Sequence, residues 1–148
     1  MKIKLARYAV IAFVILSTTA MAENNTLQQE RNAVVKRYLD DLQKADYRDI
    51  SQLFEKNGIV MSTSRGKFNA KDFFYLILPN FVSAKTELNQ TFDGSSDSNR
   101  LAARFHLKYE LKDGEKSEGE YMDEFVFSDH SVKLKAVYMF ENLKFTKE

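Results

Sequence analysis

The chain has 148 residues, and its 22 lysines and arginines nearly balance its 21 aspartates and glutamates, leaving a net charge of +1. This length suits one ordinary domain, and the lack of a basic patch argues against a nucleic-acid-binding protein. There is no cysteine, which excludes disulfides, a thiolate nucleophile and cysteine metal sites.

Residues 1–22 have the order of a secretory signal peptide. A basic start, MKIKLAR, precedes the apolar run YAVIAFVIL and the small residues AMA. The apolar run covers only residues 8–16, whereas a membrane-spanning helix needs about 20 apolar residues. We therefore expect cleavage after Ala22, no stable membrane anchor, and a single exported domain at residues 23–148, periplasmic or secreted.

Apolar residues at spacings of three and four predict an amphipathic helix over residues 28–45. Its apolar stripe consists of Ala33, Val34, Tyr38, Leu42 and Ala45. A second helix is predicted over residues 47–57, with Gly58 in the position that commonly ends a helix.

A short strand at residues 59–63 and a third helix at residues 70–84 follow. Asn69 precedes this helix as its predicted N-cap. Pro79 should kink the helix or end its regular part, because the proline ring collides with the carbonyl one turn earlier.

The second half of the chain alternates apolar and polar residues, which predicts strands. The strands expected are residues 85–92, 100–111, 117–127 and 132–145, with an Asp-Gly hairpin signal at residues 113–114. Helices followed by an antiparallel meander indicate an α+β fold. Long strands must coil or bulge, so we expect a cone-shaped, curved antiparallel sheet packed on three N-terminal helices.

One strand places a carboxyl among aromatic residues. Tyr121, Asp123, Phe125 and Phe127 alternate along it and share one face. An inward carboxyl loses hydration, and burial disfavours its charged form. We therefore expect the pKa of Asp123 to be raised more than that of any other carboxyl.

The same alternation predicts the two faces of the last strand. Its inward residues would be Leu134, Ala136, Tyr138 and Phe140. Val137 and Met139 would then point outward, beside Met122 and Val126 of the neighbouring strand. Four exposed apolar side chains on one face predict a homodimer through the outer face of the sheet.

Two segments resemble a known family. AVVKRYLDDLQKADYRDISQLFEKNGIV is similar to the opening helix pair of bacterial ketosteroid isomerases, and MDEFVF is similar to their penultimate strand. The order of elements over residues 33–145 resembles the nuclear transport factor 2-like superfamily, which includes SnoaL-like proteins. The resemblance implies that Tyr38 and Asp123 take the positions of the oxyanion hole, while the catalytic base falls on or near Ser62. A serine hydroxyl is too weak a base to replace a carboxylate at neutral pH.

Three functions follow from this resemblance. The favoured one is an aromatic-lined pocket that binds a small apolar ligand without catalysis. The alternatives are an isomerase- or dehydratase-type enzyme that uses Tyr38 and Asp123 as acid donors, and a protein-interaction domain with a vestigial pocket. Neither His106 nor His130 has a partner at metal-ligand spacing, so we expect no metal, and we expect no cofactor. The candidate ligand-binding residues are Tyr38, Ser62, Phe74, Tyr121, Asp123, Phe125, Tyr138 and Phe140.

Overall fold

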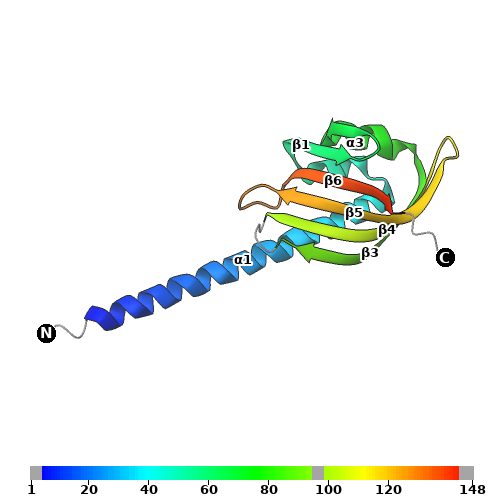
Figure 1. Ribbon diagram of the computed structural model, residues 1–148. Helices are drawn as coiled ribbons and strands as arrows, with labels where there is room; N and C mark the ends of the chain where they lie inside the picture. The colour runs from blue at the N-terminus through cyan, green and yellow to red at the C-terminus, as the bar shows by residue number, and fades with distance from the viewer. Residues whose placement is uncertain (1–4, 95–98, 144–148) are drawn as a thin grey trace.

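In the computed structural model, one curved sheet of six strands covers the helices (Figure 1). The structure describes residues 5–94 and 99–143, and it describes side chains in residues 25–94 and 99–140. The helices are α1 (Leu5–Lys44), α2 (Tyr47–Gln52), α3 (Ala70–Ile77) and the short 3₁₀ turn η1 (Leu78–Asn80). The strands are β1 (Phe54–Ser62), β2 (Gly66–Asn69), β3 (Phe81–Asp93), β4 (Arg100–Leu111), β5 (Lys116–Phe127) and β6 (Leu134–Leu143).

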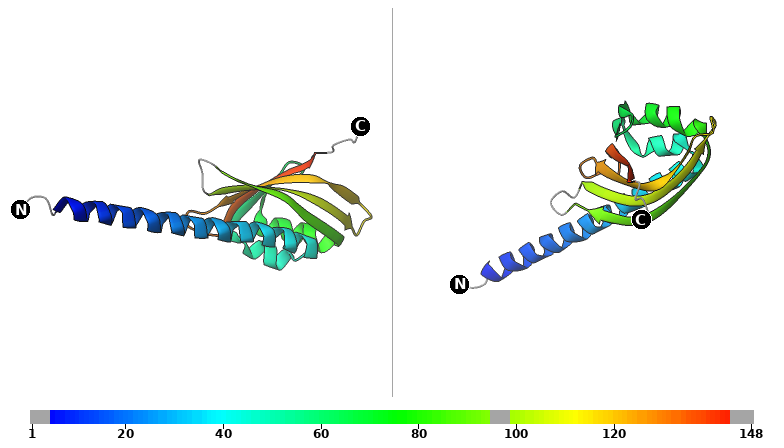
Figure 2. Two further views of the ribbon diagram at one scale, coloured as in Figure 1. Left: turned by 90° about the horizontal axis from the view of Figure 1, so that it is seen from below. Right: turned by 45° about the vertical axis from the view of Figure 1, so that its right-hand side comes forward.

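The strands lie in the order β2-β1-β6-β5-β4-β3. The predicted meander of β3, β4, β5 and β6 is antiparallel throughout, but β1 pairs with β6 in parallel. Figure 2 shows the helices together on the concave side of the sheet, which does not close into a barrel. The expected α+β cone is therefore present, with one parallel pairing in an otherwise antiparallel sheet.

Helix α1 ends where its apolar stripe predicted, at Lys44, and Ala45 follows in the left-handed conformation with φ 53°. The helix extends back to Leu5 and projects from the domain (Figure 1). Within the described residues, no helix combines the length and apolarity needed to cross a membrane. Cleavage after Ala22 would fall within α1 and remains a prediction.

Arg31 anchors α1 to the turn between β5 and β6. Its guanidinium donates to the carbonyls of Ser131 and Ser128, both at 2.9 Å, and lies 5.1 Å from the ring centre of Phe127. This side chain is almost fully buried. The charge is tolerated there because carbonyl oxygens and an aromatic face replace its water.

The second helix is shorter than the sequence predicted. It ends at Gln52, and residues 54–58 belong to β1, so the helix prediction over residues 47–57 is wrong in its second half. Gly58 does not end a helix. A Cβ there would lie 2.9 Å from the Cβ of Phe54, and the pairing of β1 with β6 shifts register between Phe54 and Ile59. Phe54 and Ile59 both pair with β6, and this pairing at the two ends of the segment outweighs its weak local helix preference.

Helix α3 begins as predicted. The Asn69 side chain accepts hydrogen bonds from the backbone nitrogens of Lys71 and Asp72, at 3.0 and 3.5 Å. Pro79 ends the regular helix as predicted, since it lies within η1. The predicted extent to residue 84 is wrong, because β3 begins at Phe81 and pairs with β4.

The predicted facing of the last strand is also wrong. Val137 lies opposite Phe125 and Met139 lies opposite Asp123, so both share the inner face. Val137 is fully buried, whereas Phe140 is 48% exposed. Tyr138 and Phe140 therefore belong to the outer face, in the places expected for Val137 and Met139.

A register shift explains this reversal. Phe127 pairs with Leu134 while the adjacent Val126 pairs with Ala136, so β6 carries one extra residue at this point. Such a bulge inverts the alternation of every residue beyond it. Leu134 still points inward, as predicted, because it precedes the extra residue.

Candidate ligand pocket

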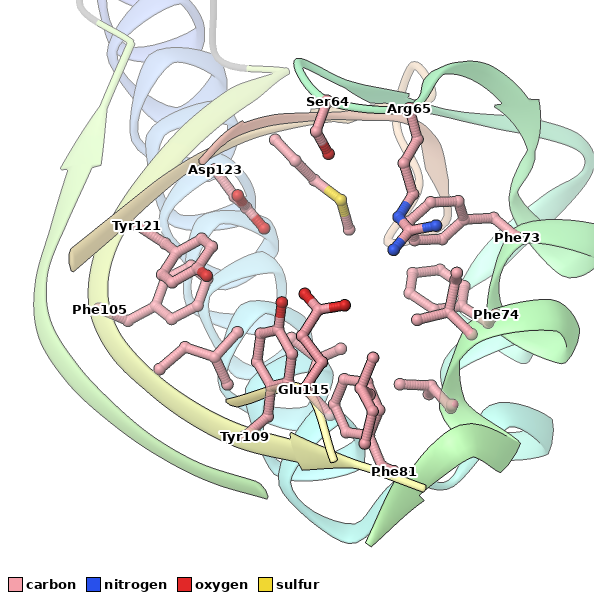
Figure 3. A pocket seen from close by; sticks show the side chains of 16 residues that line it. Ser64, Arg65, Phe73, Phe74, Phe81, Phe105, Tyr109, Glu115, Tyr121 and Asp123 are labelled. Carbon is pink, nitrogen blue, oxygen red and sulfur yellow. The ribbon is translucent and has the colours of Figure 1, made fainter. Parts of the chain in front are cut away.

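A cavity of about 400 Å³ lies between the concave face of the sheet and α3 (Figure 3). This volume falls in the range of small-molecule sites. Six aromatic side chains line it: Phe73, Phe74, Phe81, Phe105, Tyr109 and Tyr121. The aliphatic lining residues are Leu42, Ile77, Leu78, Leu107, Leu111 and Met139, and the polar ones are Ser64, Arg65, Glu115 and Asp123.

Asp123 reaches the cavity from β5 and is 2% exposed. Behind it, the Tyr38 hydroxyl of α1 donates a hydrogen bond to Asp123 Oδ2 at 3.3 Å. Burial raises the pKa of Tyr38 well above its usual value, and the charge and hydrogen bond of Asp123 raise it further. Tyr38 therefore remains protonated and acts as a donor to Asp123.

Aromatic rings hold this pair in place. The Tyr38 ring is nearly perpendicular to the rings of Phe125 and Phe74, with ring centres 5.0 and 6.0 Å apart. The Tyr121 ring stacks on Phe105 with centres 5.8 Å apart. These contacts fix the direction in which Asp123 enters the cavity, because rings packed on several sides have few alternative rotamers.

Two turns bring polar and charged side chains to the cavity. Ser64 and Arg65 come from the turn between β1 and β2, and Glu115 comes from the hairpin between β4 and β5 (Figure 3). Gly66 and Gly114 have φ of 86° and 90°, a left-handed conformation that favours glycine in these turns. The sequence marked the Asp-Gly hairpin, but not that it faces the β1–β2 turn across a pocket.

The residues predicted from sequence divide into three groups. Phe74, Tyr121 and Asp123 line the cavity. Tyr38 and Phe125 are fully buried behind its wall. Ser62, Tyr138 and Phe140 are also not among the lining residues, and the last two lie on the opposite face of the sheet.

Ser62 lies at the end of β1 and is 5% exposed. Its hydroxyl lies 3.2 Å from the Ser64 hydroxyl and accepts a hydrogen bond from the backbone nitrogen of Arg65, also at 3.2 Å. These contacts shape the turn that carries Arg65. No carboxylate occupies the position that the resemblance assigns to the base.

A second buried carboxyl, Asp41, lies outside the pocket where α1 meets α2. Burial raises its pKa to about 6, the charge of Asp49 adds to this, and the charge of Arg37 opposes it. Arg37 lies closer to Asp49, at 2.5 Å, than to Asp41, at 3.9 Å. The burial of Asp41 leaves no signal in the sequence, because it depends on how α2 folds back onto α1.

The described histidines do not form a metal centre. His106 lies on the outer face of the sheet, where its two ring nitrogens approach Glu120 and Glu118 at 3.2 and 3.3 Å. Among the described residues, no group of three or more histidines, aspartates or glutamates is placed to hold a metal ion.

No protein-family model matches the sequence, and no curated protein is similar to it in sequence. Solved structures do match its fold. A pinacolase from Penicillium brevicompactum superposes with a TM-score of 0.66 at 14% identity, covering 78% of this chain and 85% of the other. A protein of unknown function from Burkholderia pseudomallei, described as NTF2-like, gives 0.60 at 5% identity, covering 76% and 91%.

The chain has the nuclear transport factor 2-like fold. A third match is a Mycobacterium tuberculosis protein in complex with estradiol-17beta-hemisuccinate, with a TM-score of 0.63 at 15% identity, covering 77% of this chain and 95% of the other. The nuclear transport factor 2-like cone thus accounts for the curved sheet and its concave pocket. At these identities the likeness establishes the fold, and function must come from the site.

Proposed function

We propose that the protein binds a small, largely apolar molecule in the cone pocket without transforming it. The observation that carries this proposal is the cavity of about 400 Å³, lined by six aromatic rings with Asp123 at one side. Apolar walls supply binding free energy as they lose water, and one polar group fixes orientation. An open cavity disfavours the alternative of a vestigial, filled cone.

The matched structures support a small ligand. The Mycobacterium tuberculosis protein is in complex with a steroid ester, a molecule with a rigid apolar body. The rings that line the present cavity provide a similar kind of surface for an apolar body.

Filling the cavity tests the proposal. Met139→Trp places a large ring in the pocket, whereas Met122→Trp places the same ring on the outer face of the sheet. Native mass spectrometry of protein purified from its own host should show a retained small molecule in the natural protein and Met122→Trp, but not in Met139→Trp. Thermal unfolding checks that both variants fold. Retention by Met139→Trp, or absence of any bound molecule in the natural protein, contradicts the proposal.

An isomerase- or cyclase-type enzyme is the second candidate, favoured by the match to a pinacolase. Tyr38 donates to Asp123 and does not line the cavity, so only Asp123 of this pair can reach a ligand directly. The position of the base holds Ser62, and general-base catalysis typically contributes about 10²- to 10⁴-fold. We expect no measurable steroid isomerisation by the natural protein, and a gain by Ser62→Asp that Tyr38→Phe reduces. Strong activity of the natural protein would favour the enzyme.

We also propose a homodimer through the outer face of the sheet. Met122 and Val126 lie on this face as expected, and Tyr138 and Phe140 join them in place of Val137 and Met139. Sedimentation velocity should show a dimer at tens of micromolar that Phe140→Asp converts to a monomer. A monomeric natural protein would contradict this proposal.

We also propose that the protein is exported and cleaved after Ala22. Arg31, whose hydrogen bonds join α1 to the turn between β5 and β6, lies after Ala22 and would be retained in the cleaved protein. N-terminal sequencing of exported protein should read Glu-Asn-Asn, and an intact Met1 in the membrane fraction would contradict cleavage.

A further inference from the structure

Among the described residues that line the pocket, one is a cation, and the proposed function does not use it. Arg65 lines the cavity, and its guanidinium points into it beside Phe73 (Figure 3). Among the described residues, no carboxylate lies within ion-pair distance of this guanidinium. Arg65 is held at its backbone, where its nitrogen donates to Ser62, while the side chain remains available to a ligand.

The polar groups of the pocket are separated. Ser64 and Arg65 place hydrogen-bond donors on the β1–β2 turn, while Asp123 lies on the wall formed by β5 (Figure 3). A molecule that fills the cavity therefore meets Asp123 with one part and the turn with another.

A guanidinium beside apolar walls has a specific preference. Its planar set of donors matches the two oxygens of a carboxylate, and such charge-assisted hydrogen bonds are stronger than those to neutral acceptors. The neighbouring Ser64 hydroxyl lies on the same side, and it can donate to a ligand while it accepts the proton of the Ser62 hydroxyl. Glu115 enters from the opposite turn, so it repels a carboxylate and restricts it to the Arg65 side.

We propose that the ligand of this pocket is an organic acid, with an apolar body against the aromatic walls and a carboxylate held by Arg65 and Ser64. This inference rests on the proposed binding function and narrows its ligand class. It also assigns Arg65 as the residue that distinguishes acids from neutral molecules of the same shape.

Three probes with one ring system test it: 2-naphthaleneacetate, 2-naphthaleneacetamide and 2-(2-naphthyl)ethylamine, titrated calorimetrically at pH 7. The natural protein should bind the acid about tenfold more tightly than the amide. Arg65→Met keeps much of the apolar stem and should remove this preference. Glu115→Gln is the matched variant of opposite sign, and it should strengthen acid binding about two- to fivefold without changing amide binding.

Each result decides the inference. Equal affinity for acid and amide, tighter binding of the amine, or an acid preference that survives Arg65→Met would overturn it. Amide binding that Met139→Trp abolishes would leave the proposed function standing in those cases. If none of the probes bind, both the inference and the apolar pocket function lose their support.

Discussion

Two buried carboxyls, Asp41 on α1 and Asp123 on β5, lie in different surroundings. Asp123 faces a cavity among aromatic rings and accepts a hydrogen bond from Tyr38. Asp41 lies at the corner between α1 and α2, near Arg37 and Asp49, and does not line the cavity. Both carboxyls are buried, but only Asp123 lies beside a cavity with space for a ligand. Burial of a charge therefore does not by itself mark a functional site, and the adjoining cavity is the better indicator.

Phe125→Ala should have the largest effect, because it removes a fully buried ring next to the Tyr38–Asp123 pair. We expect the free energy of unfolding to fall by about 3–5 kcal/mol. Urea unfolding measures it, and Phe92→Ala, at a ring that is 39% exposed, should cost less than about 1.5 kcal/mol. Similar losses in the two variants would mean that the pocket wall is not tightly packed.

Tyr38→Phe should have the next largest effect. It keeps the ring contacts but removes the hydroxyl that donates to Asp123 Oδ2, so the free energy of unfolding should fall by about 1–2 kcal/mol. Tyr47→Phe is the control, since that ring packs against Tyr75 nearer the surface. An equal effect of both substitutions would show that the buried hydrogen bond adds no stability.

Asp41→Asn should change how stability depends on pH. The pKa of Asp41 is about 6 in the folded protein, above its ordinary value of 3.8, so folding favours the protonated form. Its contribution is complete below about pH 4 and is lost as pH rises through 6. Asn carries no charge, so the variant should match the natural protein at pH 4 and exceed it by on the order of 1 kcal/mol at pH 7.

Urea unfolding at both pH values measures this difference. Asp40→Asn is the control, because it removes an exposed ion pair with Lys44 and only the smallest of the charges that raise the pKa of Asp41. A stability difference that is the same at pH 4 and pH 7 would contradict the raised pKa. Carboxyl NMR on the natural protein extends the comparison to Asp123, whose pKa is still expected to be the most strongly raised.

Arg37→Gln should have the smallest effect on stability, a few tenths of a kcal/mol, because the ion pair with Asp49 is exposed. Its effect on titration is more informative. Arg37 opposes the rise in the pKa of Asp41, so its removal should raise that pKa further. Carboxyl NMR measures the shift, with Lys44→Gln as control. An unchanged or lower pKa would show that Arg37 does not act on Asp41.

The sequence by itself determined the elements whose signals are local. The stripe on α1, the Asn69 cap and the stop at Pro79 depend on residues within about one helical turn. Strict alternation placed Tyr121, Asp123 and Phe125 on the inner face of β5, because the pairing of these residues with β4 has no register shift. The resemblance added the pairing of Tyr38 with Asp123, which the structure confirms.

Only the tertiary structure decided where local signals compete or where distant segments meet. Residues 54–58 became strand between Phe54 and Ile59, which both pair with β6, and a bulge at the start of β6 reversed the facing of Val137 and Met139. The start of β1 at Phe54 and the bulge in β6 cannot be predicted from the alternation within one segment, since each arises from pairing between two strands. Arg65 and Glu115 share a pocket because two turns approach each other in space. The spacing of these residues in the sequence does not predict that approach.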